Sequence, residues 1–177
     1  MEYIEWYILI GVLFIYLIWI FFIADKFRTK KIVDKLQHLL QNDAKITFPF
    51  KDKSRFIITI HHKKIDVKWI QVPAHSLLTI NSKVTWKISY GGNPNKPGRV
   101  YPNERFLTEL KPFLMSTKIA DMKLILLFKS VEKRVMYLNE SELEILSATS
   151  KPHEVYVLTY NELEDQFIEI LKSENVS

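Results

Sequence analysis

The sequence predicts an α+β protein in which one N-terminal transmembrane helix precedes a mostly antiparallel sheet domain with packed helices. Three observations indicate this class. An uncharged apolar run of helical length comes first, alternating apolar and polar residues then predict strands, and amphipathic segments toward the C-terminus predict helices. The length of 177 residues suits one modest domain behind the first helix.

The apolar run extends from Trp6 to Ala24 and holds 19 residues without a charged side chain. A helix of that length covers roughly 28 Å at ~1.5 Å per residue, which approaches the ~30 Å hydrocarbon core of a bilayer. We therefore predict that residues 1–24 form a short outside N-terminus and an uncleaved transmembrane signal anchor. The residues assigned to this span are Trp6, Tyr7, Gly11, Trp19 and Ala24.

Basic residues cluster directly behind this run, whereas the charged residues before it are acidic. Basic flanks of a membrane span are retained on the cytoplasmic side, so we predict a single-pass protein of the cell membrane with a cytoplasmic C-terminal domain. The same cations would meet anionic headgroups of the lipid bilayer. The residues to which we assign this role are Lys26, Arg28, Lys30, Lys31 and Lys35.

Residues 25–44 show the pattern of a basic juxtamembrane amphipathic helix. Ile32, Leu36 and Leu39 recur at helical spacing, and lysines occupy the other side. We expect this apolar stripe to pack on the domain that follows. The alternative is a helix that lies on anionic lipid.

Residues 45–177 form the predicted domain, and its first half is rich in strand-forming residues. Apolar and polar residues alternate over 65–72 and 84–90, which is typical of half-buried strands. The separators between strands are short, so we expect antiparallel pairing. Alternation places Trp69 and Trp86 on the apolar sides of their strands.

Residues 91–102 hold three of the four glycines and three of the seven prolines, which predicts a pronounced loop between two sub-layers of the domain. Its backbone amides and two cations could bind an anion. The residues of this candidate anion-binding loop are Gly91, Gly92, Asn93, Lys96 and Arg99. The loop is not a P-loop, because Lys96 is not followed by Ser or Thr, and an ordinary Gly/Pro turn is the alternative.

Helical and strand patterns alternate in the second half of the domain. We predict a helix after Asn103 that ends or kinks near Pro112, and then a hairpin formed by 123–129 and 133–138. An acidic helical tail follows. Its predicted elements are a short helix over 140–147, a strand over 154–160 and a last helix whose buried face carries Leu163, Phe167, Ile170 and Leu171.

The net charge of +5 is distributed unevenly along the chain. Residues 1–24 carry −2, residues 25–138 carry +14 and residues 139–177 carry −7. The basic block contains interleaved aromatic residues, which is compatible with binding to anionic lipid or to nucleic acid. A solvated basic surface, partly neutralised by the acidic tail, is the alternative.

Catalytic and metal-binding patterns are sparse. The chain contains no cysteine, which excludes disulfides, thiolate metal sites and a cysteine nucleophile, and its five histidines are scattered. We therefore predict no metal, no cofactor and no catalytic set.

One acidic pattern departs from this picture. Asp52 with Asp66-Val67-Lys68 resembles the D…(D/E)xK arrangement of metal-dependent nucleases, in which two acids hold Mg²⁺ beside a lysine. If Asp52 precedes one strand of a hairpin and Asp66 opens the next, the acids lie at opposite ends, roughly 20 Å apart at ~3.3 Å per residue. At that separation the two acids could not bind the same Mg²⁺, so we predict that the pattern is not a nuclease site.

These features predict a non-enzymatic module, in which a single-pass anchor holds a basic cytoplasmic domain that binds a membrane or cytoplasmic protein, or lipid. The topology is similar to that of small bacterial immunity and accessory membrane proteins in architecture only, so regulatory, immunity-like and complex-associated roles stay open. The alternative is a membrane-tethered enzyme or binder acting on nucleic acid or phosphoesters, with Lys96 and Arg99 near its site.

Overall fold

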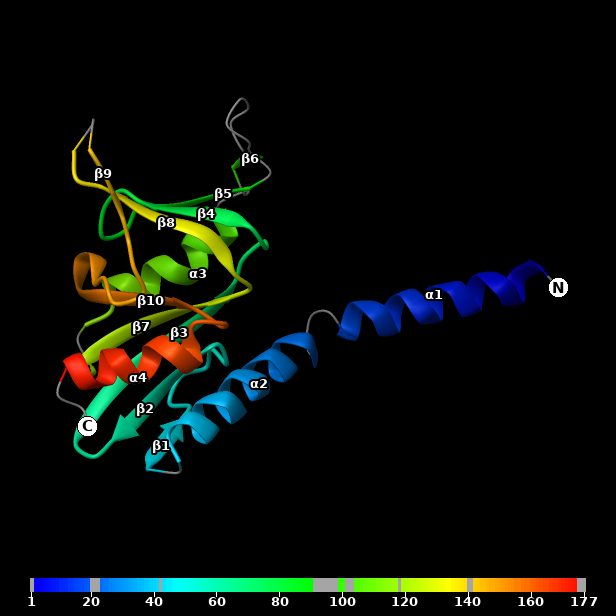
Figure 1. Cartoon of the computed structure of the whole chain (residues 1–177). Coiled ribbons are helices and arrows are strands. Elements are labelled where there is room, and N and C mark those ends of the chain that lie inside the picture. Colours follow the sequence, from blue (N-terminus) through cyan, green and yellow to red (C-terminus); the bar gives the residue numbers. More distant parts are fainter. Residues whose placement is uncertain are drawn as a thin grey trace.

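The computed structural model describes residues 2–19, 23–41, 43–90, 99–100, 104–117, 119–139 and 142–174. In these residues four layers follow one another: a pair of helices, a five-stranded sheet, one helix and a second five-stranded sheet (Figure 1). A further helix at the N-terminus extends away from these layers (Figure 1). The architecture is mixed α+β.

The first sheet, sheet A, has the strand order β1-β2-β3-β7-β10. The first three strands form an antiparallel meander, and β7 and β10 then add in parallel to β3. A parallel neighbour requires a crossover connection, which here runs through three strands of the second sheet and one helix. The bounds are Ala44–Thr47 (β1), Arg55–Ile60 (β2), Lys63–Gln71 (β3), Met122–Phe128 (β7) and Val155–Thr159 (β10).

The second sheet, sheet B, has the strand order β6-β5-β4-β8-β9. Its central strand β4 pairs antiparallel with β5 and parallel with β8, while β6 and β9 pair antiparallel at the two ends. The bounds are Ser76–Ile80 (β4), Trp86–Tyr90 (β5), Arg99–Val100 (β6), Val131–Tyr137 (β8) and Leu143–Ile145 (β9).

Helices α2 and α4 cover one face of sheet A, and α3 lies between its other face and sheet B (Figure 1). Helix α1 contacts neither sheet (Figure 1). The bounds are Glu2–Ile18 (α1), Ala24–Leu39 (α2), Glu104–Met115 (α3) and Leu163–Ser173 (α4), with a 3₁₀ turn at Pro152–Glu154.

Two apolar cores hold the layers together. The first lies between sheet A and helices α2 and α4, where Leu36 and Phe167 are fully buried. The second surrounds α3 between the two sheets and includes Trp86 and Phe113. Because sheet A is covered on both faces, β3 is buried at six consecutive positions instead of the alternate positions expected from its sequence.

Several sequence predictions are confirmed by this packing. The apolar stripe of α2 packs on the domain, since Ile32 and Leu36 are buried in the first core. Trp69 and Trp86 are buried, with exposed fractions of 4% and 1%. The last helix buries the expected face, which consists of Leu163, Phe167, Ile170 and Leu171.

The predicted pairing of the strands is wrong in part. Strands β7 and β8, expected to form a hairpin, belong to different sheets, and three of the described strand pairs are parallel. In the described part of 140–147 the predicted acidic helix is replaced by β9, which pairs with β8. Local alternation indicates strands, but their partners depend on contacts between segments that are far apart in the sequence.

The predicted transmembrane helix is also wrong. Helix α1 holds 17 residues, about 26 Å at ~1.5 Å per residue, and among the described residues no helix is long and apolar enough to cross a membrane. Of the uncharged run from Trp6 to Ala24, the part up to Ile18 belongs to α1, and Ala24 begins α2. The single-pass topology, the cell-membrane localisation and the orientation inferred from the basic flank are therefore corrected as well.

Candidate functional site

Two charged residues of β3 face α3. Ile65, Val67 and Trp69 lie in the first core, so alternation directs Asp66 and Lys68 to the opposite face of sheet A. Both are almost inaccessible to solvent, with Asp66 0% and Lys68 2% exposed. Charged groups buried to this degree require partners, which β2 and the loop before it supply.

Asp66 is held by Arg55 at the start of β2. Arg55 Nε donates to Asp66 Oδ1 at 2.9 Å and Arg55 Nη2 donates to Asp66 Oδ2 at 2.5 Å, which makes a bidentate ion pair. Nη2 also donates to Ser116 Oγ at 3.1 Å, just beyond α3. The guanidinium lies 4.0 Å from the centroid of the Phe50 ring. Both carboxylate oxygens of Asp66 are therefore engaged.

Lys68 is paired with Asp52 in the loop before β2. Lys68 Nζ donates to Asp52 Oδ2 at 2.6 Å and also to Ser54 Oγ. Asp52 Oδ1 accepts hydrogen bonds from the Ser54 N–H at 2.9 Å and the Ser54 hydroxyl at 2.6 Å. Burial alone would raise the pKa of Asp52, but the hydrogen bonds from Lys68 and Ser54 outweigh burial and hold that pKa below its usual value. The Asp52 side chain is 48% exposed, so this end of the site opens to solvent.

Lys123 of β7 lies beside Asp66, since the two residues are register partners. Its Nζ donates to the carbonyl oxygens of Phe113 and Ser116 at 2.9 Å each, which satisfies acceptors at the C-terminal end of α3. Burial lowers the pKa of Lys123, the Asp66 carboxylate opposes this effect, and the Arg55 cation adds to the lowering.

These contacts form two networks, one around Lys68 and one around Asp66, which lie side by side because Lys68 and Arg55 are register partners. We call the two networks together the Asp52–Asp66 cluster. Its members are Asp52, Ser54, Arg55, Asp66, Lys68, Ser116 and Lys123. The cluster combines three cations with two carboxylates, and the exposed Lys51 and Lys53 flank Asp52. An excess of positive charge at a partly enclosed site suits an anionic ligand.

The register of β2 and β3 differs from the one assumed in the geometric argument against the D…(D/E)xK pattern. Asp66 is the fourth residue of β3 instead of its first, and it pairs in register with Ile57. Arg55 and Lys68, the partners of the two acids, lie directly opposite each other in that register, where Cβ atoms are about 5 Å apart. The cationic partners of Asp52 and Asp66 are therefore neighbours at one end of the hairpin.

The cluster could hold a divalent cation through its two carboxylates. Among the described residues, no group of three or more His, Cys, Asp or Glu side chains is placed to hold a metal ion. Mg²⁺, however, is usually bound through one or two carboxylates, with water and substrate phosphates completing its coordination. The donor set of Asp52 and Asp66 matches that chemistry.

The basic residues of α2 do not share one environment. Arg28 Nη1 pairs with Asp25 at 2.7 Å. Lys35 Nζ donates to the Tyr160 carbonyl oxygen at 3.2 Å, and Lys31 Nζ lies 5.4 Å from the centroid of the Tyr160 ring. The exposed members of the set are Lys26, Lys30 and Lys31. Their contact with anionic lipid headgroups stays a prediction.

Most of the candidate anion-binding loop lies outside the described residues. The residues concerned are Gly91, Gly92, Asn93 and Lys96. Arg99 is described as part of β6, where it pairs in register with Tyr90. Anion binding by this loop stays a prediction.

The residues assigned to the span fall into two groups. Trp6, Tyr7 and Trp19 are 64%, 74% and 50% exposed, and Gly11 of α1 has no heavy atom within 4 Å of an added Cβ. Ala24 begins α2 and is buried. The predicted segment therefore combines an exposed helix with the first residue of the packed domain.

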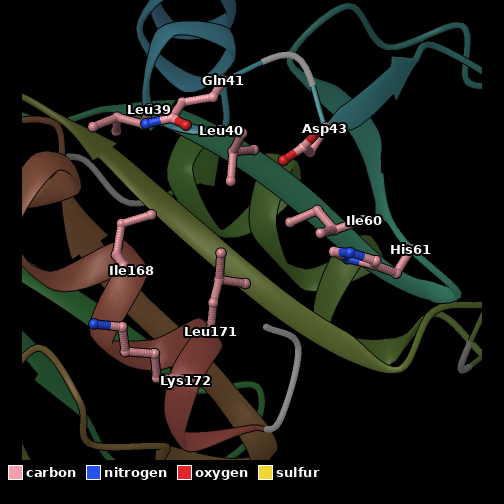
Figure 2. A pocket seen from close by; sticks show the side chains of 9 residues that line it. All are labelled: Leu39, Leu40, Gln41, Asp43, Ile60, His61, Ile168, Leu171 and Lys172. Atoms are coloured by element: carbon pink, nitrogen blue, oxygen red, sulfur yellow. The ribbon is translucent and has the colours of Figure 1, made fainter.

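An open apolar hollow lies on the face of sheet A that α2 and α4 cover (Figure 2). One side of it is formed by the C-terminal ends of α2 and β2, and the other side by α4. Its volume is about 200 Å³, and its apolar lining includes Leu40, Ile60 and Leu171. Asp43 and His61 also line it, but most of its lining side chains are aliphatic. The Asp52–Asp66 cluster therefore remains the better candidate site.

Sequence reasoning missed Arg55, Ser116 and Lys123. Arg55 carries no motif, and its role depends on the register between β2 and β3. Lys123 reaches Asp66 only because β7 pairs in parallel with β3. The separation of two between Asp66 and Lys68 was the one local signal, since it directs both side chains to the same face.

Comparison of the chain with protein-family models, curated proteins and solved structures finds no match.

Proposed function

We propose that the protein hydrolyses phosphodiesters, with nucleic acid as the substrate class, using a divalent cation at the Asp52–Asp66 cluster. The observation that carries this proposal is that Lys68, two residues from Asp66 on the same face of β3, is ion-paired with Asp52, next to the cations Arg55 and Lys123. The proposal shares the substrate class of the phosphoester alternative indicated by the sequence, but it places the site at the Asp52–Asp66 cluster instead of near Lys96 and Arg99.

The contacts of the cluster support a role for each of these side chains. The Asp52 side chain is accessible and its pKa is lowered by Lys68 and Ser54, so its carboxylate is ionised, and a metal ion would share or replace the hydrogen bonds that its oxygens accept. A bound Mg²⁺ would polarise a phosphoryl oxygen and lower the pKa of the attacking water. Lys68 Nζ, 2.6 Å from Asp52, would stabilise the negative charge that develops on the phosphate.

Metal binding by Asp66 requires a rearrangement of Arg55. Both oxygens of Asp66 accept hydrogen bonds from Arg55, so Asp66 can bind a cation only when Arg55 releases at least one oxygen. A phosphate group offers the guanidinium another bidentate partner. Binding of a phosphodiester would therefore favour the same rearrangement that metal binding requires.

A second candidate function follows from the burial of Asp66. This side chain is fully buried and its charge is neutralised by Arg55, which is also the arrangement of a structural ion pair. In that case the domain would be the non-enzymatic accessory module predicted from the sequence, and it would act by binding a partner through another surface.

Cleavage assays on the full chain separate these two functions. Labelled single- and double-stranded DNA and RNA are incubated with Mg²⁺, with Mn²⁺ and with a chelator. We expect metal-dependent cleavage that falls by about 100-fold or more in Asp52→Asn and in Lys68→Met, because each change removes a group that acts on the phosphate or its metal.

Asp43→Asn is the matched control, since Asp43 is an exposed aspartate at the hollow on the opposite face of sheet A. Thermal unfolding followed by circular dichroism would show that all variants are folded. Cleavage that persists in both cluster variants would refute the proposed site. A folded wild-type protein that cleaves none of the substrates would favour the accessory module.

A further inference from the structure

Strand β9 is one end of the strand order in sheet B and presents an open edge (Figure 1). Its inner side pairs with β8, and the Leu138 N–H donates to the Glu142 carbonyl oxygen at 3.0 Å beside that pairing. Backbone groups alternate in direction along a strand, so the peptide groups of Leu143 and Ile145 point away from β8. In the part of the chain that the structure describes, neither residue has a strand partner on that side.

Apolar side chains accompany these open peptide groups. Ile145 is 69% exposed, Leu143 is 54% exposed, and Tyr137, the register partner of Leu143, is 43% exposed. Short length, charged side chains, Pro and bulges protect edge strands, and β9 has the first two, with three residues and Glu144 at its centre, but no Lys, Pro or bulge. An open strand edge with exposed aliphatic side chains is the geometry that accepts an additional strand.

The charge at this edge narrows the choice of partner. Glu142 and Glu144 are both exposed, so the edge repels the phosphates of a nucleic acid. A second copy that paired about Glu144 would place two identical carboxylates directly opposite each other, which is destabilising. A strand that carries basic residues would instead complement the glutamates.

We propose that β9 is the docking edge for an extended segment of a partner protein in which apolar residues alternate with Lys or Arg. Main-chain hydrogen bonds to Leu143 and Ile145 would align the segment, and its apolar side chains would cover the outer face beside Tyr137. Its basic side chains would meet Glu144 on the other face. The proposal does not depend on phosphodiester cleavage, because β9 belongs to sheet B and the catalytic candidates belong to sheet A and its loops.

The probe is a blocked heptapeptide of alternating lysine and valine, with a glutamate-for-lysine peptide as its charge-reversed control. Fluorescence anisotropy would measure binding to the full chain, and amide hydrogen exchange by NMR would locate it. We expect the lysine peptide to bind and to slow exchange at the Leu143 and Ile145 amides, while the glutamate peptide binds at least tenfold more weakly.

Two variants test the mode of binding. Ile145→Pro removes the outward N–H without removing a bond to β8, so the peptide should bind at least tenfold more weakly, whereas Ile145→Val should bind normally. Glu144→Lys should weaken the lysine peptide by about fivefold and strengthen the glutamate peptide, because an opposite-charge pair across strands contributes up to ~1 kcal/mol. This surface change keeps the test valid if Ile145→Pro impairs folding.

Three outcomes would overturn the proposal. The first is no binding of the lysine peptide, and the second is protection that maps to another strand or to α1. The third is concentration-dependent dimerisation that protects Leu143 and Ile145 without peptide, since it would identify a second copy as the occupant.

Discussion

The two faces of sheet A are built from the same strands and both pack in apolar cores, but the face toward α3 also holds buried ion pairs of β3. Toward α2 and α4, β3 presents Ile65, Val67 and Trp69, and the interface is almost entirely apolar. Toward α3, the alternate positions of the same strand present Asp66 and Lys68, each buried and each ion-paired. One strand therefore supplies both a conventional core and a candidate chemical site.

The comparison shows that burial on both faces does not require apolar residues on both faces. The α3 side tolerates charge because Arg55 satisfies both oxygens of Asp66 and Asp52 pairs with Lys68. Buried ion pairs contribute little net stability, so residues of this kind are better explained by function than by folding. The two faces should accordingly differ in how they respond to mutation and to pH.

The largest loss of stability is expected on the apolar face. Phe167 of α4 is fully buried, and Phe167→Ala should lower the free energy of unfolding by about 3–5 kcal/mol, because it removes apolar contacts and leaves a cavity. Urea unfolding of wild type and variant would measure the difference. A loss below ~1 kcal/mol would show that α4 does not pack on sheet A as described.

On the charged face, the expected loss of stability depends on whether a substitution leaves Arg55 or Asp66 without its ion-pair partner. Asp66→Asn should cost about 3 kcal/mol, since the Arg55 cation keeps its burial but loses its counter-charge. The double variant Asp66→Leu with Arg55→Met should cost less than Asp66→Asn, because no buried charge is left unpaired. If the double variant is the less stable of the two, the ion pair itself stabilises the fold.

A polar contact on the apolar face should have a smaller effect. Trp69 Nε1 donates to Thr29 Oγ1 at 3.0 Å, and this bond joins β3 to α2 in the first core. Thr29→Val keeps the shape of the side chain but leaves the indole N–H without its acceptor, which should cost about 1–2 kcal/mol. Thr29→Ser is the control, and it should retain most of the stability by keeping the hydroxyl.

The smallest expected effect concerns pH and the accessible end of the charged face. The pKa of Asp52 is lowered in the folded protein, so its pairing with Lys68 contributes fully above the ordinary carboxyl pKa of 3.8 and is lost as the pH falls through the folded value. The stability difference between wild type and Asp52→Asn should therefore shrink between pH 5 and pH 2, about the range over which such a carboxylate is protonated. A difference that stays constant over this range would show that the pair is not formed in solution.

Much of the secondary structure could be predicted from local pattern. Alternation identified the strands that contain Trp69 and Trp86, and helical spacing identified the buried face of α4. Hydropathy identified a helix near the N-terminus but could not place its end at Ile18, so it predicted a membrane span that α1 does not form.

The candidate site was only partly predictable. The residue types of Asp52, Asp66 and Lys68 suggested it, but the ion pairs of Asp66 with Arg55 and of Lys68 with Asp52 depend on the register of β2 and β3 and on the loop before β2. Arg55 and Lys123 carried no local signal, because their roles depend on strand register and on a parallel pairing across sheet A.

Alternation along β3 was sufficient to place Asp66 and Lys68 on one face and the apolar residues on the other, because the direction of a side chain along a strand is a local property. Whether that polar face is exposed to solvent or buried depends on the tertiary structure. Helix α3 and sheet B cover it, so charges that the sequence suggested were solvated became a buried, paired cluster. The same packing leaves β9 at an open edge, since nothing local to Leu143–Ile145 specifies how many strands sheet B contains.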